Sequence, residues 1–240
     1  MRGMNDPVAH AKTYPFPVPG TSYRFVNGAP QPLDDHGFDR SGRVPVLAAG
    51  SNQSHEQLAR KYSVLEGHVE IPIQRAALHD FDAVYAAHLA GYGSVPSTFC
   101  PSPGTAVTTY VLWLDDAQLN RMHETERNYT YDALDEIRVD IDEAGETIAT
   151  AYIYTARVGC VNVDGAPVAL AEIPAAGRNF RAMRQHEMLS HVRDRLEPGA
   201  DLDAFIRAHI DDEALRKSRT AALSADALIL DFPRREIGAF

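Results

Sequence analysis

The sequence predicts an α+β protein in which a strand-rich region with two embedded helices precedes a helical tail. Short apolar or alternating runs, bounded by glycine and proline, dominate residues 44–163 and are typical of strands. Residues 179–195, 201–210 and 211–221 instead have helical periodicity and few breakers. Because strands and helices are segregated rather than alternating, we expect an α+β arrangement and not a doubly wound parallel sheet.

The composition is that of an ordinary globular protein. Its 240 residues are 45% hydrophobic and 23% charged, which excludes collagen, a long coiled coil and wholesale disorder. The formal net charge is −10 and no run of bases exceeds two residues, so we expect no nucleic-acid partner and no membrane partner. No apolar segment approaches the roughly 18 residues of a membrane span and no apolar leader is visible, so a cytoplasmic location is expected.

Known metal and cofactor motifs are missing from the sequence. His186 and His191 are five residues apart, so on a helix their rings would point about 140° apart and not toward one metal ion. Neither a nucleophile elbow nor a phosphate-binding loop occurs. Cys100 and Cys160 form no CxxC pair; two buried thiols are the favoured interpretation, and a single disulfide is the alternative. We therefore expect no metal and no cofactor.

Residues 1–43 differ from the rest of the chain in their high proline content. Prolines oppose helices and weaken interior strands, so we expect an extended N-terminal arm. Five aromatic side chains in this stretch favour an arm that packs across the domain surface over a free tail. The sequence thereby divides into a proline-rich arm (1–43), a strand-rich domain (44–175) and a helical extension packed on the same domain (176–240).

The strand-rich domain contains two predicted helices among its strands. Ser54 and Gln57 have the spacing of a capping box, which predicts a helix of about two turns. Asp115 and Gln118 repeat that signature and predict a second helix that ends near Glu126. The strands expected around them cover 44–49, 68–75, 82–89, 106–114, 136–141, 148–155 and 158–163, with loops at Pro96, Pro101 and Pro103.

The first candidate functional element is the turn between the strand at 44–49 and the first helix. Gly50 allows the chain to turn sharply, and the N–H groups that follow would point outward near a helix N-terminus. Such donors suit a carboxylate or a developing oxyanion, and Ser51 and Asn52 add polar side chains. The alternative is a turn with a structural role only.

The second candidate is Glu126, at the end of the second helix. It continues the i, i+3, i+4, i+7 series of Leu119, Met122 and His123, so it lies on the apolar face, whereas Glu124 points roughly the opposite way. A carboxyl group in a partly desolvated pocket suits proton transfer near neutral pH. A glutamate exposed to solvent in the last turn of a helix is the alternative.

The two elements together resemble the gamma-glutamylcyclotransferase (AIG2-like) family. Residues 46–52 are similar to the family's strand and YGSN loop, and residues 119–126 to its helix ending in LDxxEG. Residues 78–82 and 97–104 match the intervening motifs in order and spacing, so the resemblance runs from 44 to roughly 133. It implies a small, closed mixed β-barrel with surrounding helices, and both the arm and the C-terminal helical extension fall outside the minimal family domain.

The resemblance also implies an activity. The α-amine of a γ-glutamyl amine would attack its own γ-carbonyl, giving 5-oxoproline and the free amine without a cofactor, in a transferase or lyase type of reaction. The family's catalytic glutamate corresponds to Glu126, acting in turn as base and acid. The implied partner is a small-molecule γ-glutamyl or related amide substrate. The expected substrate-binding residues are Ala49, Gly50, Ser51, Asn52, Gln53, Ser54 and Tyr131.

The sequence departs from the family pattern at three positions. Ala49 replaces the tyrosine of the loop, and a tyrosine at 92, 129 or 131 is a candidate to replace its ring. In the LDxxEG motif, His123 replaces the aspartate and Arg127 the glycine, so that Arg127 is placed to pair with Glu126. Two other functions therefore stay open: a non-catalytic binding module on the same fold, and a related amide-cleaving enzyme with a different substrate. The oligomeric state is left open as well.

Overall fold

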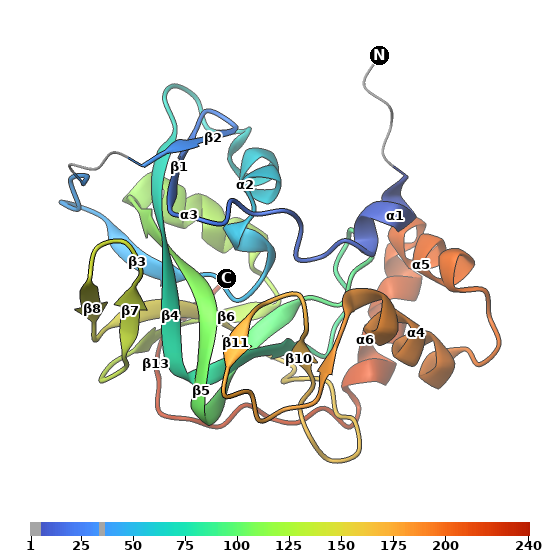
Figure 1. Cartoon of the computed structure of the whole chain (residues 1–240). Coiled ribbons are helices and arrows are strands. Elements are labelled where there is room, and N and C mark those ends of the chain that lie inside the picture. The colour runs from blue at the N-terminus through green and yellow to red at the C-terminus, as the bar shows by residue number, and fades with distance from the viewer. Residues whose placement is uncertain (1–5, 34–36) are drawn as a thin grey trace.

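The fold combines one large sheet with helices packed around it, as the computed structural model of the chain shows (Figure 1). The structure describes residues 6–33 and 37–240. The first five residues of the predicted arm, and residues 34–36, lie outside this range. In the described part the sheet is mostly antiparallel and the helices are grouped separately, so the prediction of an α+β protein is confirmed.

The sheet is built on a long hairpin of two strands, β4 (Glu70–Tyr85) and β5 (Ser97–Leu114). The main path of paired strands runs β12-β10-β4-β5-β3-β9-β6-β13, with parallel pairs at β3–β9 and β10–β12. The other strands on this path are β3 (Val44–Leu47), β6 (Tyr129–Leu134), β9 (Ala151–Ala156), β10 (Ala169–Leu170), β12 (Ala182–Met183) and β13 (Arg235–Ala239). The strands paired off this path are β1 (Tyr23–Val26), β2 (Ala29–Pro32), β7 (Val139–Ile141), β8 (Glu146–Ile148) and β11 (Ala175–Ala176).

The closed barrel implied by the family resemblance is not confirmed. Within the described residues the path of strands is open, because its two end strands, β12 and β13, do not pair with each other. Short strands cover the edges instead: β1, β7 and β10 pair with successive parts of β4, and β13 pairs with β6. The backbone groups at these edges are thereby satisfied without closure.

The hairpin is longer than the sequence predicted. Segments 68–75 and 82–89 were expected as separate strands, but β4 runs through both as far as Tyr85 and shifts register between His79 and Phe81. Asp80 lies in this irregularity with a positive φ of 62°, and its carboxylate accepts the N–H of Gly104 on the facing strand (2.8 Å). This cross-strand bond holds the bulge in register, which no local pattern could show.

Two other strand predictions are wrong. Pro101 and Pro103 lie within β5 and not in loops, at the place where the pairing with β4 is interrupted, so that their missing N–H groups are tolerated. The strand predicted over 158–163 does not form, and Cys160 makes only isolated bridges there. Cys100 and Cys160 are both buried free thiols, as favoured from the sequence.

The two embedded helices form as predicted, but only one has its capping box. In α3 (Asp116–Thr125) the Asp115 carboxylate accepts the N–H of Gln118, and the Gln118 side chain accepts the N–H of Asp115. The capping box predicted for α2 (His55–Tyr62) is wrong. The Ser54 hydroxyl donates instead to the carbonyl of Pro17 (2.8 Å), because the N-terminal segment passes directly beside this helix start.

The C-terminal part of the chain contains three helices and two strands, and it packs against the loop that follows β4. The helix predicted from residue 179 begins only at Gln185, because β12 pairs with β10 just before it, and β13 joins the sheet beside β6. Helices α4 (Gln185–Leu196), α5 (Leu202–Asp211) and α6 (Glu213–Ser224) gather at one end of the molecule beside α1 (Pro7–Ala11) (Figure 1). His209 Nε2 lies 3.0 Å from the carbonyl oxygen of Gly93, and the N–H of Leu89 donates to the Thr220 hydroxyl (3.1 Å). The extension thus holds the loop in place.

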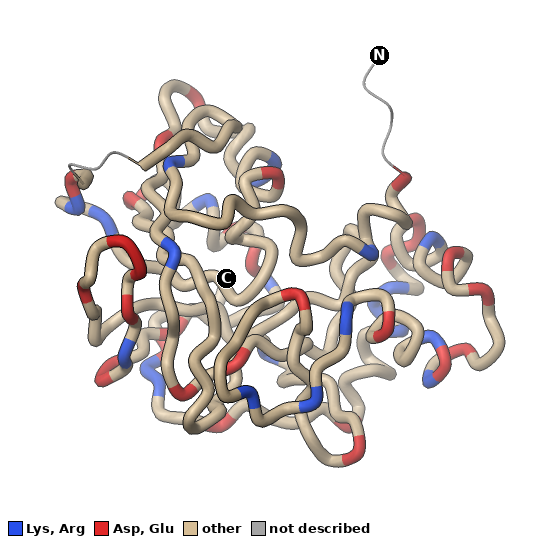
Figure 2. The backbone as a smooth tube through the Cα atoms, in the orientation of Figure 1, with Lys and Arg blue, Asp and Glu red and all other residues tan. Residues whose placement is uncertain are grey.

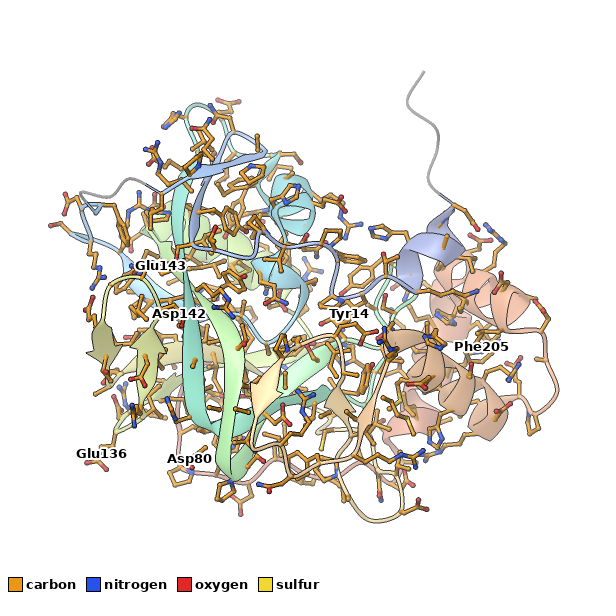
Figure 3. The ribbon with its side chains drawn as sticks, viewed as in Figure 1. Tyr14, Asp80, Glu136, Asp142, Glu143 and Phe205 are labelled. Carbon is orange, nitrogen blue, oxygen red and sulfur yellow. The ribbon has the colours of Figure 1, made fainter. Side chains whose placement is uncertain are left out.

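The N-terminal segment lies between the strand-rich part and these helices. Figure 3 shows Tyr14 in this position and Phe205 within the helical group. Along 6–33, α1 precedes the β1–β2 hairpin, which extends the sheet at β4. Basic and acidic side chains are interspersed over the elements (Figure 2). None of the helices in the described ranges has the length and apolar character needed to cross a membrane.

Candidate functional site

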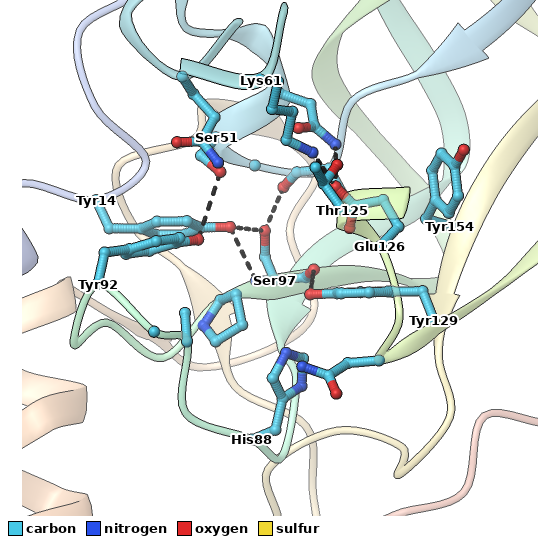
Figure 4. Close-up of a pocket in the computed structure, with 18 of the residues that line it drawn as sticks. Tyr14, Ser51, Lys61, His88, Tyr92, Ser97, Thr125, Glu126, Tyr129 and Tyr154 are labelled. Carbon is cyan, nitrogen blue, oxygen red and sulfur yellow. Dashed lines mark hydrogen bonds and ion pairs between the residues drawn. The ribbon is translucent and has the colours of Figure 1, made fainter. Parts of the chain in front are cut away.

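A cavity of about 320 Å³ lies where the loop after β3, helices α2 and α3, and the loop between β4 and β5 meet (Figure 4). It brings together both elements that the sequence singled out. The predicted residues that line it are Glu126, Ala49, Gly50, Ser51 and Asn52. The remaining wall residues include Tyr14, Lys61, His88, Tyr92, Ser97, Tyr129 and Tyr154.

Glu126 lies at the C-terminal end of α3 and is only 9% exposed, as its helical face predicted. Its Oε1 atom forms an ion pair with Lys61 and accepts a hydrogen bond from Asn52 Nδ2 (3.1 Å). Its other oxygen, Oε2, accepts no hydrogen bond from any residue in the described ranges. Arg127 is exposed and is not the partner of Glu126. The carboxylate is therefore held by one oxygen and open at the other.

Lys61 is a residue of the cavity that the sequence did not single out. It lies on α2, its side chain is 5% exposed, and its Nζ atom also approaches Met122 Sδ (3.2 Å). Burial lowers the pKa of Lys61, while the Glu126 carboxylate opposes that shift. A signal was present, because Lys61 shares the buried face of α2 with Gln57 and Leu58. A lysine on the buried face of a helix is rarely found without a charged partner.

Asn52 connects the loop to the carboxylate and keeps one polar atom free. Its Nδ2 atom donates to Glu126, whereas its Oδ1 atom is buried and has no hydrogen-bond partner. The short helix η1 (Ser51–Gln53) uses the N–H groups of Gln53 and Ser54, which donate to the carbonyls of Gly50 and Ser51. The Asn52 N–H has no such partner in the described part of the chain. It is therefore a backbone donor of this loop that is left without a partner among the described residues.

The N-terminal segment supplies a tyrosine to the wall beside Ala49. The Ser97 hydroxyl donates to the Ala49 carbonyl (2.6 Å), and the Ser97 N–H donates to Tyr14 Oη (3.0 Å). The Tyr14 hydroxyl therefore donates to Ser97 Oγ, 2.9 Å away. Burial raises the pKa of Tyr14 to about 12, so this hydroxyl keeps its proton. Tyr14 thus fills the space beside Ala49 and Gly50, a role that the sequence did not indicate for the N-terminal segment.

Two of the three tyrosines considered from the sequence reach the cavity. Tyr92 stacks on Tyr14 with ring centroids 6.2 Å apart, and the Tyr129 hydroxyl donates to the carbonyl of Ser97 (3.2 Å). Tyr131 does not line the cavity; it stacks on Tyr152. Tyr14, Tyr92 and Tyr129 thus all contribute aromatic rings to the cavity wall.

Two predicted loop residues support the site from outside the cavity. The carbonyl of Gln53 accepts the hydroxyl of Tyr23 (2.7 Å), and the Ser54 hydroxyl is engaged by Pro17. Both are buried and neither lines the cavity. They fix the loop against the N-terminal segment. No group of three or more His, Cys, Asp or Glu side chains able to hold a metal ion occurs in the part of the chain that the structure describes.

No family model and no curated protein matches this sequence. Solved structures with a similar fold include one described as gamma-glutamyl cyclotransferase, 17% identical, covering 69% of this chain and 87% of its own, with a TM-score of 0.39. A solution structure from Arabidopsis thaliana is 13% identical and covers 78% of this chain and 96% of its own, with a TM-score of 0.37. An uncharacterised protein from Homo sapiens is 17% identical, with 70% and 88% covered and a TM-score of 0.39. Scores below 0.5 do not establish a shared function.

Gly50 is required by the packing around it, and Gly50→Ala tests this. A Cβ atom there would lie 2.0 Å from Tyr14 Oη and 2.3 Å from Ser97 Oγ. We expect a loss of about 1–3 kcal/mol in the free energy of unfolding, measured by urea denaturation. Gly20→Ala is the control, because nothing lies within 4 Å of its Cβ. Equal stability of the two variants would contradict the tight contact.

The protonation of His88 gives a second prediction. Burial lowers the pKa of His88 from 6.5 to about 4, so the unfolded chain takes up this proton first as the pH falls. The folded state should therefore lose about 2 kcal/mol through this residue between pH 7.5 and pH 5. In His88→Gln this part of the pH dependence disappears, as measured by urea denaturation across the range. The exposed His186→Gln variant is the control and should keep the wild-type pH dependence.

Proposed function

We propose that the cavity binds a γ-glutamyl amine and converts it to 5-oxoproline with release of the amine. One observation carries this proposal: Oε2 of Glu126 and Oδ1 of Asn52 are two hydrogen-bond acceptors without partners in the described structure, contributed by residues already bonded to each other. An ammonium group is the ligand group that satisfies both. The α-ammonium of a γ-glutamyl group is such a donor, and it is also the nucleophile of the reaction once it has lost a proton.

The chemistry needs little beyond positioning and proton transfer. Glu126 accepts a proton from the α-ammonium, and the amine attacks the γ-carbonyl carbon to close a five-membered ring. The Asn52 N–H holds the oxygen that becomes negative. The bond to the leaving nitrogen then breaks as that nitrogen is protonated. Two protons pass from the α-nitrogen to the leaving nitrogen, and Glu126 carries them in turn.

The cavity supplies the remaining part of the acceleration by folding the substrate. Bringing the amine and the carbonyl together within one molecule contributes on the order of 7 kcal/mol or more. The buried tyrosines Tyr14, Tyr92 and Tyr129 form rigid walls, and burial raises the pKa of each hydroxyl. They remain neutral near pH 7, so they shape the cavity without competing for the protons that move. No cofactor is needed, because the nucleophile belongs to the substrate.

A second candidate function is favoured by the Lys61 pair. An ion pair between Lys61 and Glu126 also suits a non-catalytic module that binds an ammonium ligand without changing it. A related amide-cleaving enzyme would release the amine without forming 5-oxoproline. The three functions differ in their products, so one assay separates them.

Glu126→Gln tests the role of the carboxylate. Glutamine keeps the size and one acceptor of glutamate but does not accept the proton, so the release of 5-oxoproline from γ-glutamyl amides should fall at least ~100-fold. Product is measured by chromatography, and folding by circular dichroism. Glu124→Gln is the matched control, because Glu124 lies on the same helix with its side chain 61% exposed.

The outcomes are distinct. A wild-type protein that binds γ-glutamyl amides without product would support the binding module, and amine release alone would support the other amide-cleaving enzyme. Activity retained in Glu126→Gln would contradict the proposed role of this residue.

Lys61→Met tests whether the lysine positions Glu126. Without the cation, Glu126 keeps only the hydrogen bond from Asn52, so its carboxylate is no longer fixed toward the cavity, and kcat for 5-oxoproline release should fall about 10-fold or more. Lys61→Arg should preserve most of the activity, and Lys217→Met, which changes an exposed lysine, should leave it unchanged. A wild-type kcat in folded Lys61→Met protein would show that the pair serves stability alone.

A further inference from the structure

His88 lies on the wall of the cavity away from the ion pair. It follows β4, its side chain is 3% exposed, and its Nδ1 atom is buried without a hydrogen-bond partner. Figure 4 shows His88 on the far side of Ser97 and Tyr129 from Lys61. The ring packs edge-on against Tyr129, with centroids 5.3 Å apart. An unpartnered buried ring nitrogen lowers stability unless a ligand supplies its partner.

The surroundings of His88 are uncharged. Burial is the cause that lowers its pKa to about 4, so the ring is neutral near pH 7. The lining side chains that carry charge are all on α2 and α3: Arg60, Lys61, Arg121 and Glu126. The other lining residues of the loop and of β6 are also uncharged: Ala90, Gly91, Tyr92, Pro96 and Tyr129. The cavity therefore has a charged end at Glu126 and a neutral end at His88.

We infer that His88 is a specificity-determining residue, which hydrogen-bonds an uncharged polar group carried by the leaving amine. This inference rests on the proposed function, in which the glutamyl group occupies the charged end at Glu126 and Asn52. The leaving amine then extends toward His88. A carboxamide or hydroxyl satisfies a neutral imidazole, whereas a carboxylate at this end is desolvated without a cation to pair with. The substrate class is thus γ-glutamyl amides of amines that carry an uncharged polar substituent.

Two substrates of nearly equal size show whether the charge or the shape of the leaving amine determines the reaction rate. In γ-glutamyl-glycinamide and γ-glutamyl-glycine the leaving amines differ only in a carboxamide or a carboxylate. We expect kcat/KM to be at least ~10-fold higher for the carboxamide, the factor that about 1.4 kcal/mol of hydrogen bonding supplies. His88→Phe should lower the ratio of γ-glutamyl-glycinamide to γ-glutamyl-ethylamide turnover about 10-fold. His88→Asn, which places a neutral side chain capable of hydrogen bonding here, should retain more of the ratio than His88→Phe.

A binding measurement keeps this inference separate from the proposed reaction. N-acetylglycinamide and N-acetylglycine represent the leaving side without a γ-glutamyl group, and the ring resonances of His88 report their binding by nuclear magnetic resonance. Preference for N-acetylglycinamide, lost in His88→Phe, would support the subsite even if no γ-glutamyl amide were turned over. Equal binding of both compounds, no binding of either, or a faster reaction with γ-glutamyl-glycine would overturn it.

Discussion

The site depends on one buried ion pair, between Lys61 on α2 and Glu126 at the end of α3. Glu126 is only 9% exposed, so its carboxylate needs a cation and hydrogen bonds to offset the water it has lost, and Asn52 provides the second partner. These contacts join two helices and the loop that precedes α2 around a single oxygen atom. Because they all use Oε1, the other oxygen is left for a ligand. Oε1 of Glu126 therefore holds the structure together, while Oε2 of the same side chain can contact a ligand.

Segments remote in the sequence complete the cavity around this pair. Tyr14 comes from the N-terminal segment, and its hydroxyl occupies the space that a side chain at Gly50 would need. The C-terminal helices hold the opposite wall, where His209 contacts the carbonyl of Gly93. Both ends of the chain therefore stabilise the walls of a small cavity.

The charged side chains lie at one end of the cavity, and this favours one orientation of a bound molecule. The ionised groups of the cavity lie on two helices, and its neutral imidazole lies beyond Ser97 and Tyr129. A bound molecule with a charged end and an uncharged polar end has one favourable orientation in such a site, because the reverse orientation desolvates charge without a partner. Orientation of this kind is what a reaction between two groups of one substrate requires.

Local sequence patterns determined the elements of this protein, and tertiary contacts decided how they are used. The capping box at Asp115 and the periodicity of the second helix predicted that Glu126 lies on the inner face. The sequence could show this because both patterns involve residues less than eight positions apart. The partner of Glu126 is 65 positions away, and Tyr14 is 83 positions from Ser97, so no local period could reveal either. β4 continues through Asp80 because the Asp80 side chain bonds to Gly104 on the other strand of the hairpin. The edges of the open sheet are covered by short strands from distant parts of the sequence. Periodicity reports which face of an element is buried, whereas the identity of what it meets is set only when distant segments pack together.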